Sequence, residues 1–411
     1  MTKTLELIKQ KSFIGFIYLY IFLMPWNFTN GQMGFLSIIL FIWWLVIAKK
    51  NEYFTKIQSI VMYKPLILFI LFLLYSYISL FWTDNFENAK ISLKYYKYYW
   101  LMIPVLLTTL SYENAKKSIY ILFISIGIYS LFSISIFLEI INITSDTTSP
   151  STPSNPRGIL AYAIVTPYMA ILALSSVPLY IYSKNKYLKN IFLFFGFSSF
   201  IALFLNNGRA GQLAFFATIG VLIFLLRKYF FKHPKVILIL IVALVLSLML
   251  LSSTGKFDRL SGAFLEFQNL EQKHFDGSWG HRAYMWYAAG DILQDKTNFI
   301  FGTGSGDNID EFIKYTKDHP SKATWLRSFH NQHLDTLTKY GIIGYTLLWG
   351  SILLLLYKIK DKILFYYIGI IFFSITFFDG LADIILLMKP FNTIFMLMFL
   401  LLSIISVKEE K

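Results

Sequence analysis

Long apolar segments alternate with short polar segments over most of the 411 residues of the chain. A helix needs about 20 mainly apolar residues to cross the hydrocarbon core of a bilayer. The pattern predicts about twelve such helices and hence an all-α, polytopic membrane protein. They are expected at 12–25, 33–48, 65–82, 97–111, 117–141, 158–182, 188–206, 210–231, 235–252, 336–357, 362–380 and 383–406. The segments 12–25 and 33–48 could instead form a re-entrant pair.

One segment breaks this pattern, because residues 253–335 are polar. The predicted organisation is therefore transmembrane helices in 1–252, a large loop in 253–335 and further transmembrane helices in 336–411. Loops of this length are usually functional. Apolar residues recur at helical spacing in His281–Gln294 and Asn308–Lys317, which predicts two loop helices, the second with Asn308 and Glu311 as a capping pair.

The lysines and arginines predict the orientation. With the N-terminus in the cytoplasm, most Lys and Arg residues outside the large loop fall in cytoplasmic segments. The short outer loops then hold only Lys90, Lys94, Lys97, Arg157 and Arg209. The positive-inside rule favours this arrangement, with both termini cytoplasmic and the large loop outside. The first apolar run, Phe13–Met24, is followed by no small-residue cleavage site, so we expect an uncleaved span.

Composition supports a lipid environment. The chain is 56% hydrophobic and 19% aromatic, above the roughly 45–50% apolar content of soluble domains. A net charge of +14 would suggest nucleic acid for a soluble protein; here the charge lies in short loops, so we expect a lipid bilayer and no nucleic acid as partner. The absence of Cys excludes disulfides and thiolate metal sites.

Two arginines have contexts that suit an anionic ligand. Arg209 lies between Gly208 and Gly211, before an apolar span. The small glycines would let a ligand approach the guanidinium closely, and the planar guanidinium suits a phosphate. Arg282 begins a predicted helix, where an anion would gain from both the side chain and the free N–H groups. The alternative for Arg209 is a side chain that only extends to the membrane interface, and the alternative for Arg282 is a solvated charge on a polar loop.

The strongest local feature is the segment His330-Asn331-Gln332-His333 before the helix that re-enters the membrane. An imidazole at a helix N-terminus is a usable base near neutral pH. His330 and His333 could share a helix face, but no third ligand follows at metal-binding spacing, so we expect no metal.

Charged and glycine residues near this segment are also informative. Asp379 and Asp383 flank the turn before the final span, and Lys389, inside it, is expected to pair with one of them. The glycines at 302–306 are interpreted as a structural turn, since no GK[ST] follows and no strand precedes them. The glycines at 341–344 are expected to allow close helix packing.

In this order, these motifs resemble those of the bacterial O-antigen ligase and polymerase superfamily. The resemblance covers about residues 200–350 and rests on R-A-G at Arg209, H-R-x-x-x-W at Arg282, G-x-G-x-G at Gly302, H-N-x-x-L at His330 and G-x-x-G at Gly341. One departure is His333, where the family more often has an aromatic residue.

The resemblance implies a GT-C-like membrane glycosyltransferase of the bacterial inner membrane. The donor would be a glycan on undecaprenyl pyrophosphate, the acceptor a sugar of lipid A-core, and no cofactor or metal is expected. The expected catalytic residues are Arg209, Arg282 and His330. Further substrate-binding residues are expected at Asn331, His333, Asp379, Asp383 and Lys389.

Alternative functions remain open. One dominant outer loop favours a ligase over a polymerase or a protein O-oligosaccharyltransferase of the same superfamily, because polymerases often divide their polar residues between two outer loops. A solute transporter is a separate class, but the chain shows no internal repeat, and its spans carry few charges at mid-depth.

Overall fold

The structure is a computed structural model in which helices dominate. It describes residues 2–27, 31–49, 51–56, 62–143, 151–225, 227, 242, 245, 249, 275, 277–319 and 328–407. Within these residues every regular element is a helix, apart from one isolated bridge between Thr152 and Asn155. The prediction of an all-α protein is confirmed for this part of the chain.

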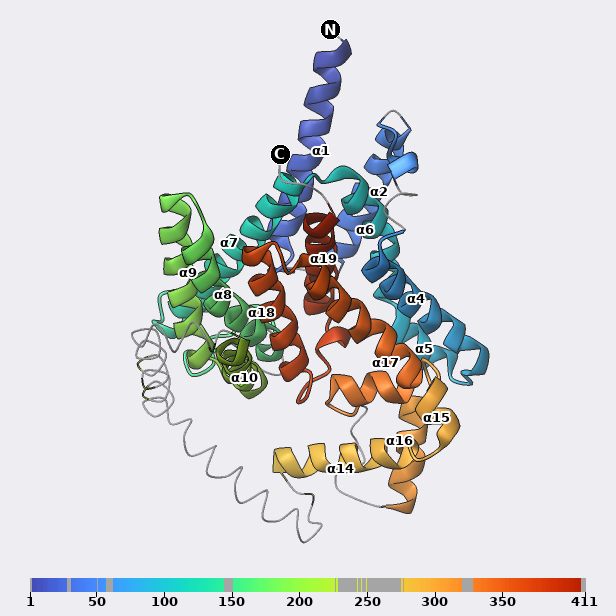
Figure 1. The fold of residues 1–411 in the computed structure, drawn as a ribbon. Coiled ribbons are helices and arrows are strands. Elements are labelled where there is room, and N and C mark those ends of the chain that lie inside the picture. Colours follow the sequence, from blue (N-terminus) through green and yellow to red (C-terminus); the bar gives the residue numbers. More distant parts are fainter. Residues whose placement is uncertain are drawn as a thin grey trace.

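The described helices fall into two groups along the chain, separated by the start of the large loop (Figure 1). Before it lie α1 (Thr2–Leu23), α2 (Gln32–Ala48), α4 (Lys64–Ile78), η1 (Ser79–Trp82), α5 (Phe86–Leu93), α6 (Tyr96–Thr109), α7 (Tyr112–Phe137), α8 (Tyr162–Tyr182), α9 (Lys186–Leu205) and α10 (Arg209–Leu225). After it come α14 (Gly277–Ile292), α15 (Lys296–Phe301), α16 (Asn308–Asp318), α17 (Gln332–Ile359), α18 (Ile363–Asp379), η2 (Ile385–Leu387) and α19 (Lys389–Val407).

Six of these helices are long and apolar enough to cross a bilayer: α4 with η1, α7, α8, α9, α17 and α19. Four shorter apolar helices accompany them, namely Lys11–Leu23 within α1, α2, α10 and α18. The span expected at 97–111 corresponds to α6, whose 14 residues extend only about 21 Å. This is less than the roughly 30 Å of a bilayer core. The span expected at 235–252 lies almost wholly outside the described residues.

Helix α19 forms the centre of the bundle (Figure 1). Almost all of its side chains are buried, and it packs against α6, α7, α17 and α18. A helix that is apolar on every side is stable only when other helices surround it. The turn that leads into α19 therefore lies near the axis of the bundle.

The two predicted loop helices are present as α14 and α16, and they share a small apolar core. Its buried members are Tyr284, Met285, Ala288, Ala289, Ile292, Phe312 and Phe329. The Tyr284 hydroxyl donates a hydrogen bond of 2.5 Å to the carbonyl of His319. Burial, and secondarily the charge of Tyr315, raise the pKa of Tyr284, so this hydroxyl remains a donor near neutral pH.

The glycine segment fastens the loop to α17, as the structural interpretation of these glycines predicted. Thr303 and Gly304 donate backbone hydrogen bonds to the carbonyls of Thr338 and Lys339. Gly302 has a φ of +80°, and a Cβ there would lie 2.2 Å from the Lys339 carbonyl oxygen. Gly341 has a φ of +60° and forms a kink in α17, where a Cβ would lie 2.2 Å from the Ile300 carbonyl oxygen of α15. These two positions require glycine because of both backbone conformation and contact distance.

The predicted capping pair at α16 is wrong. Asn308 is buried and donates a hydrogen bond of 3.3 Å to Asp335 instead of capping the helix. The residue before it, Asp307, occupies the N-cap position but makes no capping hydrogen bond. Its carboxylate accepts hydrogen bonds of 2.8 Å from the backbone N–H groups of Asp84 and Asn85. Contacts between distant parts of the chain therefore replace the local cap.

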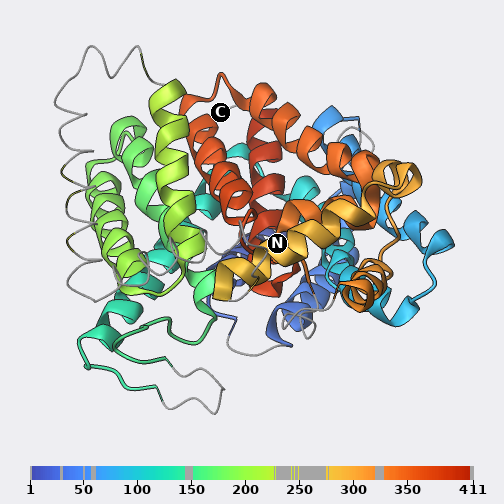
Figure 2. The same ribbon diagram turned by 90° about the horizontal axis from the view of Figure 1, so that it is seen from below.

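These hydrogen bonds join the large loop to the segment between η1 and α5. Ser79 and Ser305 add a buried side-chain hydrogen bond of 2.6 Å. Both labelled termini lie at the opposite end of the bundle from α14, α15 and α16 (Figure 1). We call the end that carries these three helices the loop end, and Figure 2 shows α14 crossing it.

Candidate functional site

The candidate site is built on the turn between α18 and α19, residues 380–388. The first residue of α17, Gln332, donates its backbone N–H to the carbonyls of Gly380 at 2.7 Å and Asp383 at 3.1 Å. Its side-chain oxygen accepts a hydrogen bond of 2.9 Å from the N–H of Leu386. The start of α17 and this turn are thus one hydrogen-bonded unit.

His330 lies directly before this unit and faces Asp383. Its backbone has a φ of +42°, a conformation uncommon outside glycine. Asn331 caps α17 by accepting hydrogen bonds from the N–H groups of His333 and Leu334. The His330 Nδ1 lies 3.5 Å from Asp383 Oδ1, which is an ion-pair distance rather than a full hydrogen bond. The His330 side chain is 38% exposed, so the ring remains accessible.

Arg282 reaches the same turn from α14. Its Nε donates a hydrogen bond of 3.2 Å to the carbonyl of Ala382, the residue before Asp383. The guanidinium also lies 5.8 Å from the ring centre of Trp279. Two site residues expected from the sequence, Arg282 and His330, therefore meet at neighbouring residues of one turn although they are far apart along the chain.

Asp379 lies beneath this turn, at the end of α18. It is fully buried, and neither carboxylate oxygen has a hydrogen-bond partner among the described residues. Its backbone carbonyl accepts hydrogen bonds of 3.0 Å from the N–H groups of Ala382 and Asp383. The backbone of Asp379 thus shapes the turn, while Asp383 is the carboxylate that faces His330.

His333 is separated from His330 by its contacts. It is buried, with Nε2 at 2.9 Å from the carbonyl oxygen of Phe377 and Nδ1 at 3.1 Å from the Tyr345 hydroxyl. Because a carbonyl can only accept, Nε2 carries the proton and Nδ1 accepts from the tyrosine. The ring also stacks on Trp349. His333 therefore joins α17 to α18, with both ring nitrogens in use.

Arg209 begins α10, which packs against α8 and α18. The side chain is exposed and makes no hydrogen bond or ion pair with a described residue. The flanking Gly208 and Gly211 pack on Thr166, where a Cβ would lie 2.2 Å and 2.6 Å from the threonine oxygen. These glycines allow α8 and α10 to approach closely. The structure gives Arg209 no direct contact with Arg282 or His330.

The Lys389 side chain, at the start of α19, lies against α6. Its Nζ is 5.8 Å from the centre of the Tyr98 ring, at the start of α6. Lys389 therefore follows the turn in sequence, with its side chain against α6.

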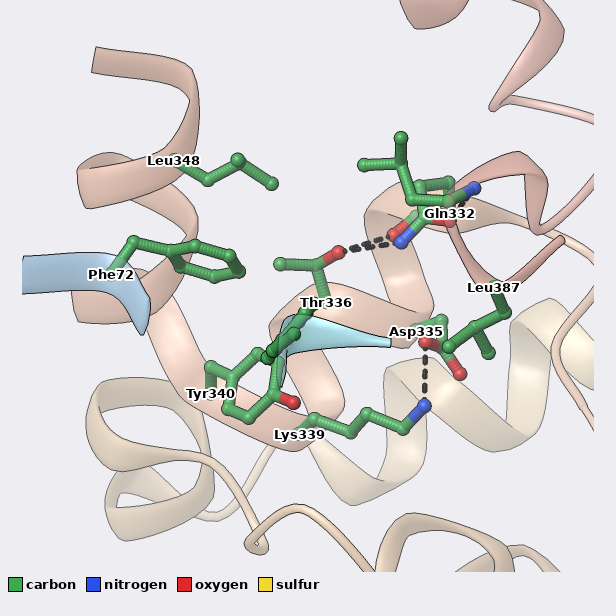
Figure 3. Close-up of a pocket in the computed structure, with 10 residues that line it drawn as sticks. Phe72, Gln332, Asp335, Thr336, Lys339, Tyr340, Leu348 and Leu387 are labelled. Atoms are coloured by element: carbon green, nitrogen blue, oxygen red, sulfur yellow. Dashed lines mark hydrogen bonds and ion pairs between the residues drawn. The ribbon is translucent and has the colours of Figure 1, made fainter. Parts of the chain in front are cut away.

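The sequence analysis missed a buried ion pair inside α17. Asp335 and Lys339 are joined at 2.8 Å, and each side chain is 4% exposed. They line a cavity of about 10 Å³, room for about one water molecule (Figure 3). The cavity is therefore too small for a glycan. The spacing of four residues was visible in the sequence, but it usually marks a solvated pair.

Comparisons with known proteins match the part of the chain that carries most of this site. Residues 193–349 match the family model described as O-antigen ligase. An uncharacterized protein of Haemophilus influenzae is 30% identical over 180 residues, which is 41% of this chain and 43% of the relative. The chain thus matches less than half the length of this relative. The resemblance to the ligase family is confirmed for the region that carries Arg209, Arg282 and His330.

Proposed function

We propose that this protein transfers a glycan from undecaprenyl pyrophosphate to a sugar hydroxyl of lipid A-core at the periplasmic face of the inner membrane. The observation that carries the proposal is the meeting of Arg282 and His330 at the α18–α19 turn. Both residues belong to the region that matches the O-antigen ligase model.

The arginines would stabilise the leaving group. When the bond between sugar and phosphate breaks, negative charge develops on the pyrophosphate. Arg282 uses its Nε to bond the Ala382 carbonyl, which fixes the direction of the guanidinium. A fixed guanidinium stabilises developing charge strongly because it does not need to reorient during the reaction. Arg209 would contact the same pyrophosphate from α10 once the donor is bound.

His330 would act as the general base. If the distance to Asp383 shortens when substrate binds, the carboxylate accepts a hydrogen bond from Nδ1–H, and the unprotonated Nε2 takes a proton from the acceptor hydroxyl. The oxygen of that hydroxyl then forms a bond to the anomeric carbon as the bond to the pyrophosphate breaks. In-line attack inverts the anomeric centre. Retained configuration in the product would contradict this mechanism.

The topology belongs to the same proposal. The chain would cross the membrane about twelve times, with both termini cytoplasmic and residues 253–335 periplasmic. The position of the termini at the end opposite α14, α15 and α16 supports this arrangement (Figure 1).

The test is transfer by the purified protein in proteoliposomes that contain lipid-linked glycan and lipid A-core, in the presence of a chelator of divalent metals. Arg282→Ala and His330→Ala should each abolish transfer to the core, whereas Arg227→Ala should not. Arg227 is the matched control because it lies just beyond the other end of α10 and donates to a carbonyl of its own segment.

Other products would identify other functions. Lengthening of the lipid-linked glycan without transfer to the core would make the protein a polymerase, and transfer to a protein would make it a protein O-oligosaccharyltransferase. A protein that is folded but inactive with every acceptor would revive the transporter hypothesis.

A further inference from the structure

The short helix α15 of the large loop ends in apolar side chains that are exposed. These are Phe299, Ile300 and Phe301, each at least 40% exposed. The other end of the helix is polar, since Asp295 caps it and Lys296 begins it. A patch of exposed apolar residues marks contact with a membrane, a protein or a ligand. The position of α15 in the fold indicates which of these it contacts.

The apolar end of α15 lies beside α4, well before the end of that helix. The Tyr75 hydroxyl donates a hydrogen bond of 3.0 Å to the carbonyl of Phe301. Helix α4 with η1 is long and apolar enough to cross a bilayer, and it ends at Trp82. The seven residues from Tyr75 to Trp82 extend about 10 Å. The end of α15 therefore lies within the limits of this span and not beyond them.

After α15 the chain returns along α4 toward the loop end. Ser305 is bonded to Ser79 at 2.6 Å, nearer the end of the span than Tyr75. Asp307 then accepts hydrogen bonds from the N–H groups of Asp84 and Asn85, which follow the span. A short helix that leads inward and a chain that leads out on the same side form a re-entrant segment.

The contacts with α17 give the same order of depths. The Ile300 carbonyl lies against Gly341, and Thr303 donates its N–H to the carbonyl of Thr338, three residues nearer the start of α17. The returning chain, residues 302–306, is buried. Non-helical backbone occurs at membrane depth only where protein covers it. The returning chain meets this condition, because it lies against both α4 and α17.

Exposed apolar residues on the adjacent spans continue the surface of α15. Along α4 and η1 they recur at spacings of three and four, which places them on one helix face: Leu71, Leu74, Ile78 and Phe81. On α17, Ile342 is exposed next to the Gly341 contact. Figure 1 shows α15 beside the loop end of α17, on the side of the bundle where α4 lies. The apolar face of a span that no other helix covers faces lipid.

We propose that α15 enters the leaflet on the loop side of the membrane, where Phe299, Ile300 and Phe301 contact the hydrocarbon chains of phospholipids. Lipid is the occupant because the patch continues the exposed faces of two spans and lies at their depth. Lys296 would remain among the head groups. Part of the segment 253–335 would then lie within the membrane, and it would fix the depth of the adjoining start of α17. The proposal does not depend on glycan transfer.

The test places a fluorophore on α15. The chain contains no Cys, so Phe299→Cys can be labelled at one position with bimane maleimide. The labelled protein is reconstituted in nanodiscs of phosphatidylethanolamine and phosphatidylglycerol. Its emission should shift to the blue relative to the label in water. Phospholipids with brominated acyl chains should quench the emission, and iodide in the buffer should not.

Two reference positions calibrate the quenching. Leu74→Cys on the exposed face of α4 reports hydrocarbon, and Lys314→Cys on α16 reports water. Phe299→Cys should lose as much emission to brominated lipid as Leu74→Cys, whereas Lys314→Cys should lose emission to iodide alone. Ile300→Cys is an independent second variant with the same expected result. Lys296→Cys should be quenched by iodide, because the polar start of α15 stays at the head groups.

The opposite results would overturn the proposal. Quenching of Phe299→Cys and Ile300→Cys by iodide alone would place α15 in water. Shielding of both positions from both quenchers would mean that protein, such as a second copy of this chain, covers the patch. Both readings come from nanodiscs without any substrate. A protein that transfers no glycan could therefore still confirm the position of α15, and an active protein could refute it.

Discussion

His330 adopts a strained backbone conformation at the centre of the candidate site. A φ of +42° is unfavourable for a residue with a Cβ, and such strain persists only where the surroundings impose it. Here the two residues that follow are held in place, Asn331 by capping α17 and Gln332 by its bonds to the turn. The result is an imidazole that points at Asp383 without being part of α17.

The first prediction concerns Asp383. Asp383→Ala should lower kcat about 10- to 100-fold and leave the donor KM nearly unchanged, because the carboxylate orients His330 and does not contact the donor. Steady-state kinetics with lipid-linked glycan would measure both constants. Asp361→Ala is the control, since this exposed aspartate lies at the other end of α18. An Asp383→Ala enzyme with the original kcat would show that His330 needs no carboxylate.

The second prediction concerns the shape of Arg282. Arg282→Lys keeps the charge but loses the planar group that bonds Ala382 and, in the proposed function, would face the pyrophosphate at the same time. We expect kcat/KM for the donor to fall about 100-fold for Arg282→Lys and up to about 1,000-fold for Arg282→Ala. Arg227→Lys should have no effect. Equal activity of the lysine variant and the natural protein would mean that charge alone is sufficient.

At the scale of elements, the attachment of α15 to α17 determines where the turn and His330 lie relative to the loop. The third prediction is that Gly302→Ala destabilises the protein by about 1–3 kcal/mol, because the new Cβ meets a backbone carbonyl and the φ is positive. Gly290→Ala is the matched control, since a Cβ in that α14 position meets open space. It should be neutral or stabilising by up to about 1 kcal/mol. Thermal unfolding in detergent would measure both, and equal melting temperatures would contradict the role assigned to Gly302.

Helices were the part of the fold that the sequence predicted best. Apolar spacing found α16 to within one residue and α14 with its start four residues too late and its end two residues too late, because each helix buries one face. It did not find the buried pair Asp335–Lys339, because the residues around it, such as Phe72 of α4 in the same cavity, come from other parts of the chain. The Asn308 cap failed for the same reason, since its partner Asp335 lies in another helix. Spacing along the chain predicts helices, whereas contacts between distant segments determine capping and burial, which spacing does not show.

The sequence predicted which residues form the candidate site but not which of them contact one another. Arg282 and His330 were found by motif and resemblance. That His330 faces Asp383, and not Asp379, depends on the bonds between Gln332 and the turn. Spacing allowed the two histidines to share a helix face, but the partners of His333 on α17 and α18 keep its ring away from that of His330.

At the scale of the whole molecule, hydrogen bonds from distant segments bring the functional elements to one end. Asp307 joins the loop to the start of α5, and Thr303 joins it to α17. Helix α17 then crosses the bundle once and returns as α18, so the short connection around Asp361 lies at the end where the termini lie (Figure 1). The two ends of α17 should therefore be reached from opposite sides of the membrane.

The fourth prediction tests this orientation. Because the chain contains no Cys, a single introduced cysteine is the only thiol and needs no altered background. Lys314 on α16 has an exposed side chain, and Asp361 is exposed between α17 and α18. A membrane-impermeant maleimide should label Lys314→Cys in intact spheroplasts and Asp361→Cys only after permeabilisation. The reverse pattern would place the large loop in the cytoplasm, away from any lipid-linked glycan presented outside. Labelling of both positions from the same side would mean that α17 does not cross the membrane, and the proposed site would then lose the helix on which His330 is positioned.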